Sequence, residues 1–414
     1  MFCGLDFGTS NSAIGIQASQ GLTLAPIEDG QRTLPSAIFF DEELKRPCFG
    51  RAAMNGYLLG HSGRLMRGLK SVLGSSLMNE ATAVCGQRLT FVEIIATFLA
   101  HLKTHAEAQA GAHLSAVVHG RPVRFTDSED ADRRAQDELE AIARRVGFTD
   151  ISFQFEPIAA ATTYEATVER ETLALIADIG GGTSDFSLVR LDPARAGRAE
   201  RGGDVLGNEG VRLGGTDLDT CLSLARVMPE FGYGETLQDG RLRTPNHLFL
   251  SLATWSRIND IYSPDARRDI RWLLRQADDP ERIQRLADLA DHRHGHRVAA
   301  GVEEAKITLS DESGTRIDLS YVEDDLMVAV TRRDLEEAVG ASMDRLSARV
   351  RACLSSAGVG PDRVDVVVMT GGSTLLPAVR RAIIKEVPNA QVHDCDQFGA
   401  VAMGLTLEAA RRYG

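Results

Sequence analysis

An aspartate, a run of glycines and a threonine follow one another in the segment Leu173–Leu191, LALIADIGGGTSDFSLVRL. The apolar residues before the aspartate predict a buried strand, the glycines a tight turn and the remaining residues a return strand. Glycines let the backbone bring exposed N–H groups close to phosphate oxygens, and carboxylates can hold a cation. The segment therefore predicts a phosphate-binding hairpin, although a hairpin without any ligand fits the same pattern. Its candidate residues are Asp178, Gly180, Gly181, Gly182, Thr183 and Asp185.

The N-terminal segment Gly4–Ile16, GLDFGTSNSAIGI, repeats this plan, with Asp6 in the place of Asp178. Two copies of one hairpin, more than a hundred residues apart, indicate an internal repeat. We expect two halves related by pseudo-symmetry, with a polyphosphate between the facing turns, so that the active site is a cleft between domains. The candidates in this copy are Asp6, Gly8, Thr9, Ser10 and Asn11.

Two more charged side chains are candidates for chemistry in that cleft. Residues 64–73, RLMRGLKSVL, are predicted to be helical, and Lys70 can present a positive charge to phosphate or to a water. Glu156 precedes Pro157, which suits a first helical position, at a predicted corner between a strand and a helix. The alternatives are a solvated lysine and a carboxylate that complements a helix dipole, a contribution of about 0.3 to 1 kcal/mol.

Further glycine turns follow along the chain. Gly214-Gly215 and Thr370-Gly371-Gly372-Ser373 are each predicted to open a helix, whose N-terminus favours anions. Residues 246–309 are predicted to be almost wholly helical, and Thr331 is predicted to cap one long helix. His292, His294 and His296 form a histidine cluster with no acidic or cysteine partner at ligand spacing, which argues against a metal site.

Composition restricts the possible classes of protein. The chain has 414 residues, 43% of them hydrophobic, which is enough for two sizeable cores. A net charge of -12 argues against general affinity for nucleic acid or an anionic membrane. Six scattered cysteines favour reduced thiols, and no apolar run approaches the roughly 20 residues that span a bilayer. Since no leader precedes the first predicted strand, we expect a cytoplasmic protein.

Taken in order, these motifs resemble the actin, hexokinase and DnaK-type ATPase superfamily, and within it the 70-kilodalton heat-shock chaperones. The resemblance rests on GLDFGTSNS, LKSVLG, FEPIAAA, ADIGGGTSD, RLGGTDLD, EEAKITLS and MTGGSTLLP, and it covers nearly the whole chain as a nucleotide-binding domain. The helical elaboration before EEAKITLS and the short length look most like the YegD-type members. The resemblance implies an α/β, actin-like ATPase fold with two pseudo-symmetric RNase H-like lobes and a helical insertion in the second lobe. We expect lobe I to span residues 1–172 with the helix 396–414 returning to it, and lobe II residues 173–395, with a helical subdomain at about 218–310.

The resemblance also implies ATP or ADP as the ligand, with Mg²⁺ and, as a further candidate ion, K⁺. Asp6 and Asp178 would hold the magnesium through waters, while Lys70, Glu156 and Asp185 would place the attacking water. Two like charges about 4 Å apart repel by roughly 4 kcal/mol at an effective dielectric near 20, so carboxylates beside a triphosphate require a divalent cation. The expected nucleotide-binding residues are Gly8, Thr9, Ser10, Asn11, Gly180, Gly181, Gly182, Thr183, Gly214, Gly215, Glu303, Lys306, Ser310, Gly371, Gly372 and Ser373.

Two departures from the chaperones matter. Their two adenine-stacking arginines are replaced here by Ile307 and Leu375, which forfeits cation–π attraction of roughly 0.5 to 2 kcal/mol per face and predicts weaker nucleotide binding. About ten residues follow Gly404, so we expect no peptide-binding domain, and a co-chaperone or client would dock elsewhere, with residues 246–300 as the candidate surface.

Four functions remain open at this level. The first is a slow DnaK-like ATPase and chaperone, in which hydrolysis drives opening and closing of the lobes. The others are a nucleotide-sensing scaffold without useful hydrolysis, an actin-like polymerising ATPase and a kinase for a sugar or another small molecule. Sedimentation with ATP would identify the polymer, and stimulation of ATP consumption by a polyol or sugar would identify the kinase.

Overall fold

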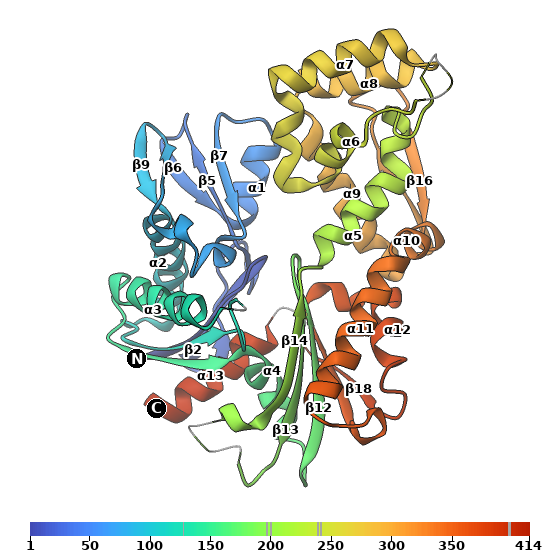
Figure 1. Cartoon of the computed structure of the whole chain (residues 1–414). Helices are drawn as coiled ribbons and strands as arrows, with labels where there is room; N and C mark the ends of the chain where they lie inside the picture. The colour runs from blue at the N-terminus through green and yellow to red at the C-terminus, as the bar shows by residue number, and fades with distance from the viewer. Residues whose placement is uncertain (127, 196–197, 199–200, 238–239, 241, 396–398) are drawn as a thin grey trace.

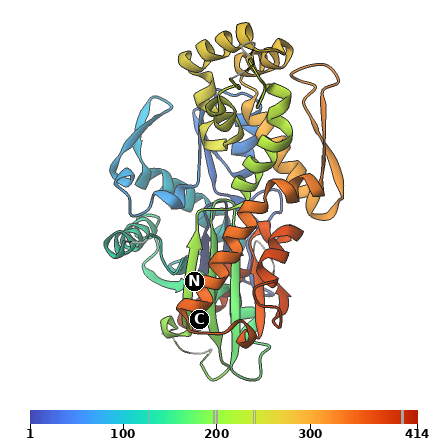
Figure 2. The same ribbon diagram turned by 45° about the vertical axis from the view of Figure 1, so that its right-hand side comes forward.

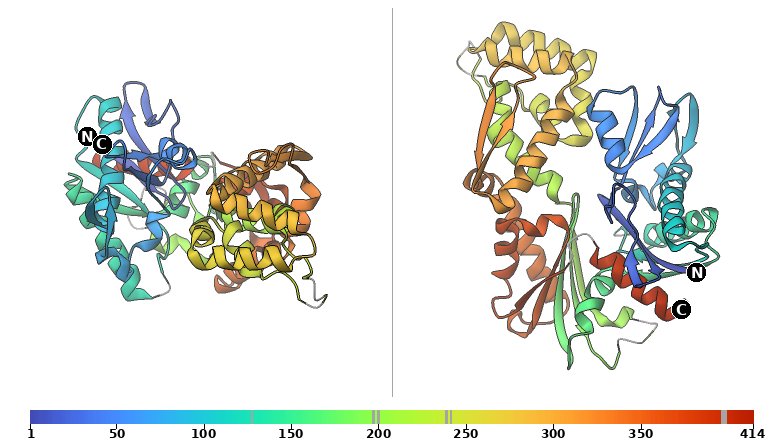
Figure 3. Two further views of the ribbon diagram at one scale, coloured as in Figure 1. Left: turned by 90° about the horizontal axis from the view of Figure 1, so that it is seen from above. Right: turned by 180° about the vertical axis from the view of Figure 1, so that it is seen from behind.

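The computed structural model describes residues 1–126, 128–195, 198, 201–237, 240, 242–395 and 399–414. The chain forms two halves that stand side by side, each built around one mixed sheet (Figure 1). Both chain termini lie on the half that contains the N-terminal strands (Figure 3). The protein is therefore of the α/β class, as the sequence predicts.

The first large sheet has the strand order β11-β10-β1-β2-β3, and β4 pairs with β2. The strand β1 runs antiparallel to β2 and parallel to β10, and β10 runs parallel to β11. The β1–β2 hairpin contains the first predicted phosphate turn. The strands are β1 (Phe2–Phe7), β2 (Asn11–Ala18), β3 (Gly21–Leu24), β4 (Leu34–Pro35), β10 (Ala116–Arg121) and β11 (Asp150–Phe155).

The second large sheet has the strand order β14-β13-β12-β17-β18. The strand β12 runs antiparallel to β13 and parallel to β17, and β17 runs parallel to β18, so order and direction match those of β3-β2-β1-β10-β11. The repeat predicted from the two glycine hairpins is thus a repeat of whole sheets. The strands are β12 (Thr172–Ile179), β13 (Ser184–Leu191), β14 (Val205–Val211), β17 (Val366–Thr370) and β18 (Gln391–Asp394).

Two helices, α4 (Glu156–Glu165) and α13 (Ala400–Tyr413), form a layer shared by both sheets. Their buried side chains join one apolar cluster with residues of β1, β10, β12 and β17. The two helices approach so closely that a Cβ on Gly404 would lie 1.9 Å from the carbonyl oxygen of Ala159. Close packing of these helices therefore links the two halves at their base. The first residues of the expected helix 396–414, residues 396–398, lie outside the described residues.

The other face of the first sheet is covered by α2 (Phe91–Ala110) and α3 (Glu129–Arg145). A capping box starts α2, since Thr90 Oγ1 accepts a hydrogen bond from the Glu93 N–H and the Glu93 carboxylate accepts one from the Thr90 N–H. The rings of Phe7 and Phe98 pack with their centroids 5.9 Å apart. This core fixes the strand that carries Asp6.

The first half also contains a smaller sheet beside its large one, and this smaller sheet shows that one prediction is wrong. Residues 64–73 are not a helix, because β7 (Gly63–Arg67) pairs with β5 (Ala37–Asp41) and only η1 (Leu69–Val72) is helical. Gly68 separates them with a φ of 66°, a left-handed conformation that glycine adopts without strain. The largely apolar residues 34–40, whose pattern predicts one strand, are likewise divided between β4 and β5. The remaining elements here are β6 (Arg46–Phe49), α1 (Gly50–Leu58), η2 (Ser76–Asn79), β8 (Ala81–Val84) and β9 (Gln87–Thr90).

Helices build the upper part of the second half, as the sequence predicts. Ser263 and Asp279 act as N-caps, with side chains that accept hydrogen bonds from the N–H groups of Ala266 and Glu281. No helix in the described ranges is both long and apolar enough to cross a bilayer. The elements are α5 (Gly215–Leu222), η4 (Ser223–Val227), η5 (Met228–Phe231), α6 (Asn246–Ala253), η6 (Trp255–Tyr262), α7 (Pro264–Gln276), α8 (Pro280–Asp291) and α9 (Gly295–Asp311).

Two other helix predictions need correction. The single helix expected after Thr331 is two helices, because Val339 leaves helical geometry, with a φ of −93° and a ψ of 2°, just before Gly340. The turn at Gly371-Gly372 opens a short 3-10 turn, and the α-helix that follows begins only at Pro377. The elements are η3 (Gly202–Asp204), β15 (Gly314–Asp318), β16 (Met327–Thr331), α10 (Arg332–Ala338), α11 (Gly340–Ser356), η7 (Pro361–Arg363), η8 (Gly372–Leu375) and α12 (Pro377–Ile384).

Candidate functional site

The two glycine hairpins face each other. A Cβ on Gly181, in the β12–β13 turn, would lie 2.1 Å from the hydroxyl of Ser10, in the β1–β2 turn. Thr9 of the first turn lies beside Gly68, which directly precedes the segment that carries Lys70. The structure therefore brings the two predicted phosphate turns and the predicted lysine into one place.

The later glycine turns gather around the second hairpin. The carbonyl oxygen of Gly180 accepts hydrogen bonds from the Gly215 N–H, at 2.9 Å, and from the Ser373 hydroxyl, at 3.2 Å. A Cβ on Gly214 would overlap the backbone of Gly181, at 2.5 Å, and a Cβ on Gly371 would lie 2.8 Å from Asp178 Oδ1. Close backbone approach at these turns needs glycine, which is a physical reason for the repeated Gly-Gly pairs.

An ion pair joins the predicted catalytic lysine to the predicted catalytic glutamate. Lys70 Nζ lies 2.5 Å from Glu156 Oε1, and both side chains are nearly buried. Burial alone would lower the pKa of Lys70, but the negative charges of Glu156 and Asp6 outweigh it and raise that pKa. The lysine therefore keeps its charge at the floor of the cleft.

Three aspartates share this floor. Burial and repulsion from Glu156 and Asp178 raise the pKa of Asp6 well above its usual range, although Lys70 opposes the shift. Burial and the charge of Asp185 raise the pKa of Asp178 to about 7, and burial and Glu156 raise that of Asp185 to about 6. These carboxylates outnumber the positive charge beside them, so the protein alone stabilises them poorly as anions.

A cavity opens on these groups. Glu156, Asp178 and Asp185 all line it, together with Thr370 at the end of β17. On its far side Asn208 of β14 accepts a hydrogen bond of 2.8 Å from Ser187 of β13. The sequence predicts Thr370 as part of a glycine turn but not as a site residue, and it gives no signal for Asn208 or Ser187. Its other lining residues are Pro122, Val123, Pro157, Ala160 and Ile176.

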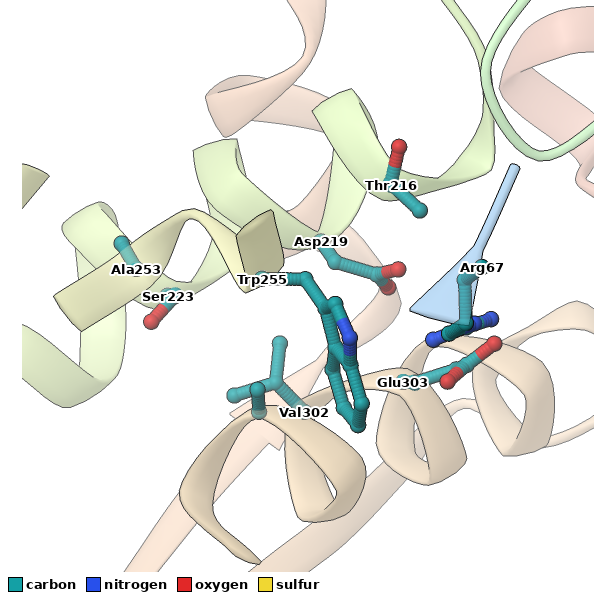
Figure 4. Close-up of a pocket in the computed structure, with 9 residues that line it drawn as sticks. Arg67, Thr216, Asp219, Ser223, Ala253, Trp255, Val302 and Glu303 are labelled. Atoms are coloured by element: carbon teal, nitrogen blue, oxygen red, sulfur yellow. The ribbon is translucent and has the colours of Figure 1, made fainter. Parts of the chain in front are cut away.

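The two halves also touch at the top of the cleft, around a second cavity (Figure 4). The guanidinium of Arg67, on β7, lies 4.7 Å from the ring centroid of Trp255, on η6. Nearby, Tyr57 of α1 and Nδ1 of His296 of α9 lie 3.1 Å apart, within hydrogen-bonding distance. These contacts join elements of opposite halves, and only His296 of the four stood out in the sequence, as a member of the histidine cluster.

The predicted base-binding residues lie on α9 and η8. Lys306 Nζ lies 2.8 Å from Asp219 Oδ1 and donates a 3.2 Å hydrogen bond to the carbonyl oxygen of Gly215, so it ties α9 to the glycine turn before α5. Ile307 and Leu375 are exposed, at 59% and 40% of their surface. Glu303 lines the upper cavity beside Arg67 and Trp255. Ser310 follows one turn after Ile307, and its carbonyl oxygen accepts a hydrogen bond from Arg332.

The histidine cluster is engaged in ring contacts. The rings of His292 and His294 stack with centroids 5.7 Å apart, and His294 meets Tyr321 edge to face. Among the described residues, no group of three or more histidine, cysteine, aspartate or glutamate side chains is arranged to hold a metal ion directly.

Two sheets that share one order of five strands, with glycine hairpins facing across a cleft, define the actin-like ATPase fold. A family model described as Hsp70 protein matches residues 2–237 and 270–414. The chain belongs to the Hsp70 family, whose members are ATP-binding, chaperone-like ATPases. The unmatched residues 238–269 include α6 and η6.

Proposed function

We propose that this protein binds ATP and ADP between its two glycine hairpins and hydrolyses ATP slowly, with hydrolysis coupled to opening and closing of the two halves. The observation that carries the proposal is the Lys70–Glu156 ion pair at the floor of a cleft that also holds Asp178 and Asp185. A lysine held charged beside carboxylates suits phosphoryl transfer, where positioning and charge stabilisation supply most of the catalysis.

The phosphates would lie between the facing turns. Thr9, Ser10 and Asn11 would line them from the first hairpin, and Gly180–Thr183 would hold them from the second. The close approach of Gly181 to Ser10 supports this assignment, because it brings the two glycine turns next to each other. Gly214, Gly215, Gly371, Gly372 and Ser373 would continue the path toward the nucleoside.

Magnesium suits this site. Burial, together with neighbouring carboxylates, raises the pKa values of Asp178 and Asp185, and a divalent cation would stabilise both groups as anions. Since the described residues include no set of three directly coordinating side chains, Asp6 and Asp178 would hold the ion through waters, with phosphate oxygens as its other ligands. When bound, the ion would offset charge on the phosphates, and K⁺ is a further candidate in the same cleft.

Lys70, Glu156 and Asp185 would position the attacking water. Lys70 can donate a hydrogen bond to that water or to the γ-phosphate, while the two carboxylates accept hydrogen bonds from it. The water would attack in line with the departing ADP oxygen. Lys70 would then offset the negative charge that develops on the transferred group.

The nucleoside would bind along α9. Glu303, Lys306 and Ser310 would contact the sugar and base, and the exposed Ile307 and Leu375 would form the walls for the base.

We further propose that the protein is a cytoplasmic chaperone of the short YegD type, which acts with a co-chaperone or client protein and needs neither nucleic acid nor a membrane.

The two halves would move as two units. We propose residues 1–172 with α13 as the first and 173–395 as the second, with the helical part at about 218–310. The shared helices α4 and α13 would be the hinge layer, because their apolar cluster reaches both sheets. The stretch 396–398 of this division lies outside the described residues.

Calorimetry with ATP and with ADP, each with and without magnesium, tests the proposal. The parent should bind both nucleotides with a strong magnesium requirement, and Asp178→Asn should lose most of that requirement. A single-turnover assay with excess protein then separates slow hydrolysis from none. If the protein binds nucleotide but does not hydrolyse ATP, the remaining function is that of a nucleotide-sensing scaffold. Binding by the parent that does not depend on magnesium would contradict the proposed site.

A further inference from the structure

The helix α7 lies at the end of the second half that is remote from the cleft floor (Figure 2). It carries a stripe of exposed basic and aromatic residues. Arg268, Arg271, Trp272 and Arg275 are all exposed and follow the spacing i, i+3, i+4 and i+7, which places them on one side of a helix. Trp272 exposes 43% of its surface. We call these four residues the α7 stripe.

The opposite face of α7 accounts for its packing. Ala266, Ile270 and Leu273 are buried in the apolar core of the second half, against α8 and η6. Trp272 contributes to neither that core nor, within the described ranges, any ring or cation–π contact. The folded chain therefore does not need an indole at this position, and exposure of a large apolar ring costs free energy that a partner can recover.

Two of the three arginines of the α7 stripe differ from their neighbours in charge pairing, whereas the third, Arg268, pairs with Asp265. Arg267 pairs with Asp291, and Arg285 pairs with Glu230 and Glu323. Arg271 and Arg275 form no ion pair with any carboxylate in the part of the chain that the structure describes. Unpaired positive charge on a chain of net charge -12 creates a local site for an anionic group.

The stripe is also separate from the nucleotide machinery. None of the predicted phosphate-binding and catalytic residues lies on α7, and none of the four stripe residues lines either cavity. The helix η6, on which α7 packs, lies in the unmatched segment 238–269, and α7 itself begins there. Of the stripe, Arg268 lies in the unmatched segment, whereas Arg271, Trp272 and Arg275 lie in the matched range 270–414.

We propose that the α7 stripe binds an acidic segment of a partner protein, which places an apolar side chain on Trp272 and carboxylates on Arg271 and Arg275. Arginine forms bidentate hydrogen bonds with carboxylates, and a tryptophan with arginines around it is typical of the residues that dominate binding energy. A protein segment fits better than a nucleic acid, because three arginines on a strongly acidic chain neutralise few phosphates.

Fluorescence anisotropy with labelled probes tests this inference on the full chain. The probes are a short synthetic peptide with one phenylalanine flanked by glutamates, the same peptide with lysines for glutamates, the acidic peptide with serine for phenylalanine, and a single-stranded DNA of equal charge. The variants are Trp272→Ala and the double variant Arg271→Glu/Arg275→Glu. The matched controls are Leu59→Ala, at another exposed apolar residue, and Arg316→Glu, at an exposed arginine on β15.

The expected result is binding of the acidic phenylalanine peptide by the parent, with about tenfold or greater loss in each α7 variant and none in the controls. Binding should also weaken as salt increases. The inference is overturned if no peptide binds, if the serine peptide or the DNA binds as tightly, or if Arg316→Glu loses as much affinity as the double variant. It is also overturned if sedimentation shows a dimer that Trp272→Ala dissociates, because the stripe would then serve a second copy of the chain.

Discussion

Lys70 Nζ and Glu156 Oε1 lie 2.5 Å apart, and this ion pair connects the short turn η1 to the first residue of α4. Both side chains are nearly buried, so neither charge is well solvated without the other. Removal of one partner of a buried pair typically costs about 3 to 5 kcal/mol, since the remaining charge is left uncompensated. The pair therefore contributes to the local structure of the cleft as well as to its proposed chemistry.

Lys70→Ala should abolish ATP turnover and leave nucleotide binding largely intact. The lysine is proposed to stabilise charge that develops during hydrolysis, whereas the glycine turns supply most of the contacts to the bound phosphates. Phosphate release and calorimetry with ADP measure the two effects separately. Lys385→Ala, at the exposed lysine that directly follows α12, is the matched control and should hydrolyse ATP as the parent does. An unchanged rate in Lys70→Ala would refute its assignment.

Arg67→Ala should accelerate the release of bound ADP. Arg67 lies over Trp255 across the top of the cleft. On the proposed function, a nucleotide bound between the hairpins leaves when the two halves separate there. Loss of a cation–π contact worth about 0.5 to 2 kcal/mol predicts a dissociation rate that rises about two- to thirtyfold. Stopped-flow measurement with a fluorescent ADP analogue reports this rate.

Arg64→Ala is the matched control for Arg67→Ala. Arg64 lies on the same strand, β7, and is exposed, with no described aromatic ring beneath it. Its loss removes the same charge from the same strand but leaves the contact with Trp255 in place. If both variants release ADP at the same rate, the loss of one positive charge from β7 explains the effect, and the contact between Arg67 and Trp255 does not control release.

Local chemistry made much of the site predictable. The turns that carry Asp6 and Asp178 are set by residues adjacent in sequence, because glycine alone permits such close backbone approach, and the structure brings both turns together. The corner at Glu156 was predictable for the same reason, since Pro157 fixes the start of its helix.

Long-range pairing made the remainder unpredictable. Residues 64–73 have a helical pattern, yet β7 forms because residues 37–41 pair with it as an antiparallel strand. The pattern of residues 64–73 alone cannot predict this pairing, because the partner strand lies elsewhere in the chain. The contacts of Arg67 with Trp255 and of Tyr57 with His296 join residues far apart in the chain. Such contacts are a property of the tertiary fold and leave no periodic signal in the sequence.

His119 should make the stability of the protein depend on pH in mildly acidic solution. Its imidazole is fully buried, and burial, with a smaller effect of Lys70, lowers its pKa to about 4 from an ordinary value near 6.5. Below pH 6.5, His119 takes up a proton in the unfolded chain but stays neutral in the folded chain. The free energy of unfolding therefore falls as the pH is lowered, until the pH reaches about 4. At pH 5 the loss relative to pH 7 should be about 2 kcal/mol.

Urea denaturation of the parent and of His119→Phe at pH 7 and pH 5 measures this contribution. The variant should lose about 2 kcal/mol less than the parent on acidification, because phenylalanine has no proton to gain. His247→Phe, at an exposed histidine, is the control and should lose as much as the parent. Equal losses in all three proteins would show that His119 is protonated as readily in the folded chain as in the unfolded one.

Ile307→Arg and Leu375→Arg should each strengthen the binding of ADP. Both side chains are exposed, on α9 and η8, at the places proposed to enclose the base, where aliphatic groups offer no attraction to a π system beyond packing. A guanidinium over the base adds about 0.5 to 2 kcal/mol, which corresponds to about two- to thirtyfold tighter binding per face.

Calorimetry with ADP and with inorganic pyrophosphate separates an effect on the base from a general effect of positive charge on phosphate, because only ADP should bind more tightly. Leu59→Arg places the same charge on another exposed leucine and should change neither affinity. If the two arginine variants bind pyrophosphate more tightly by the same factor as ADP, Ile307 and Leu375 do not form the walls of the base site, and the base must bind elsewhere in the cleft.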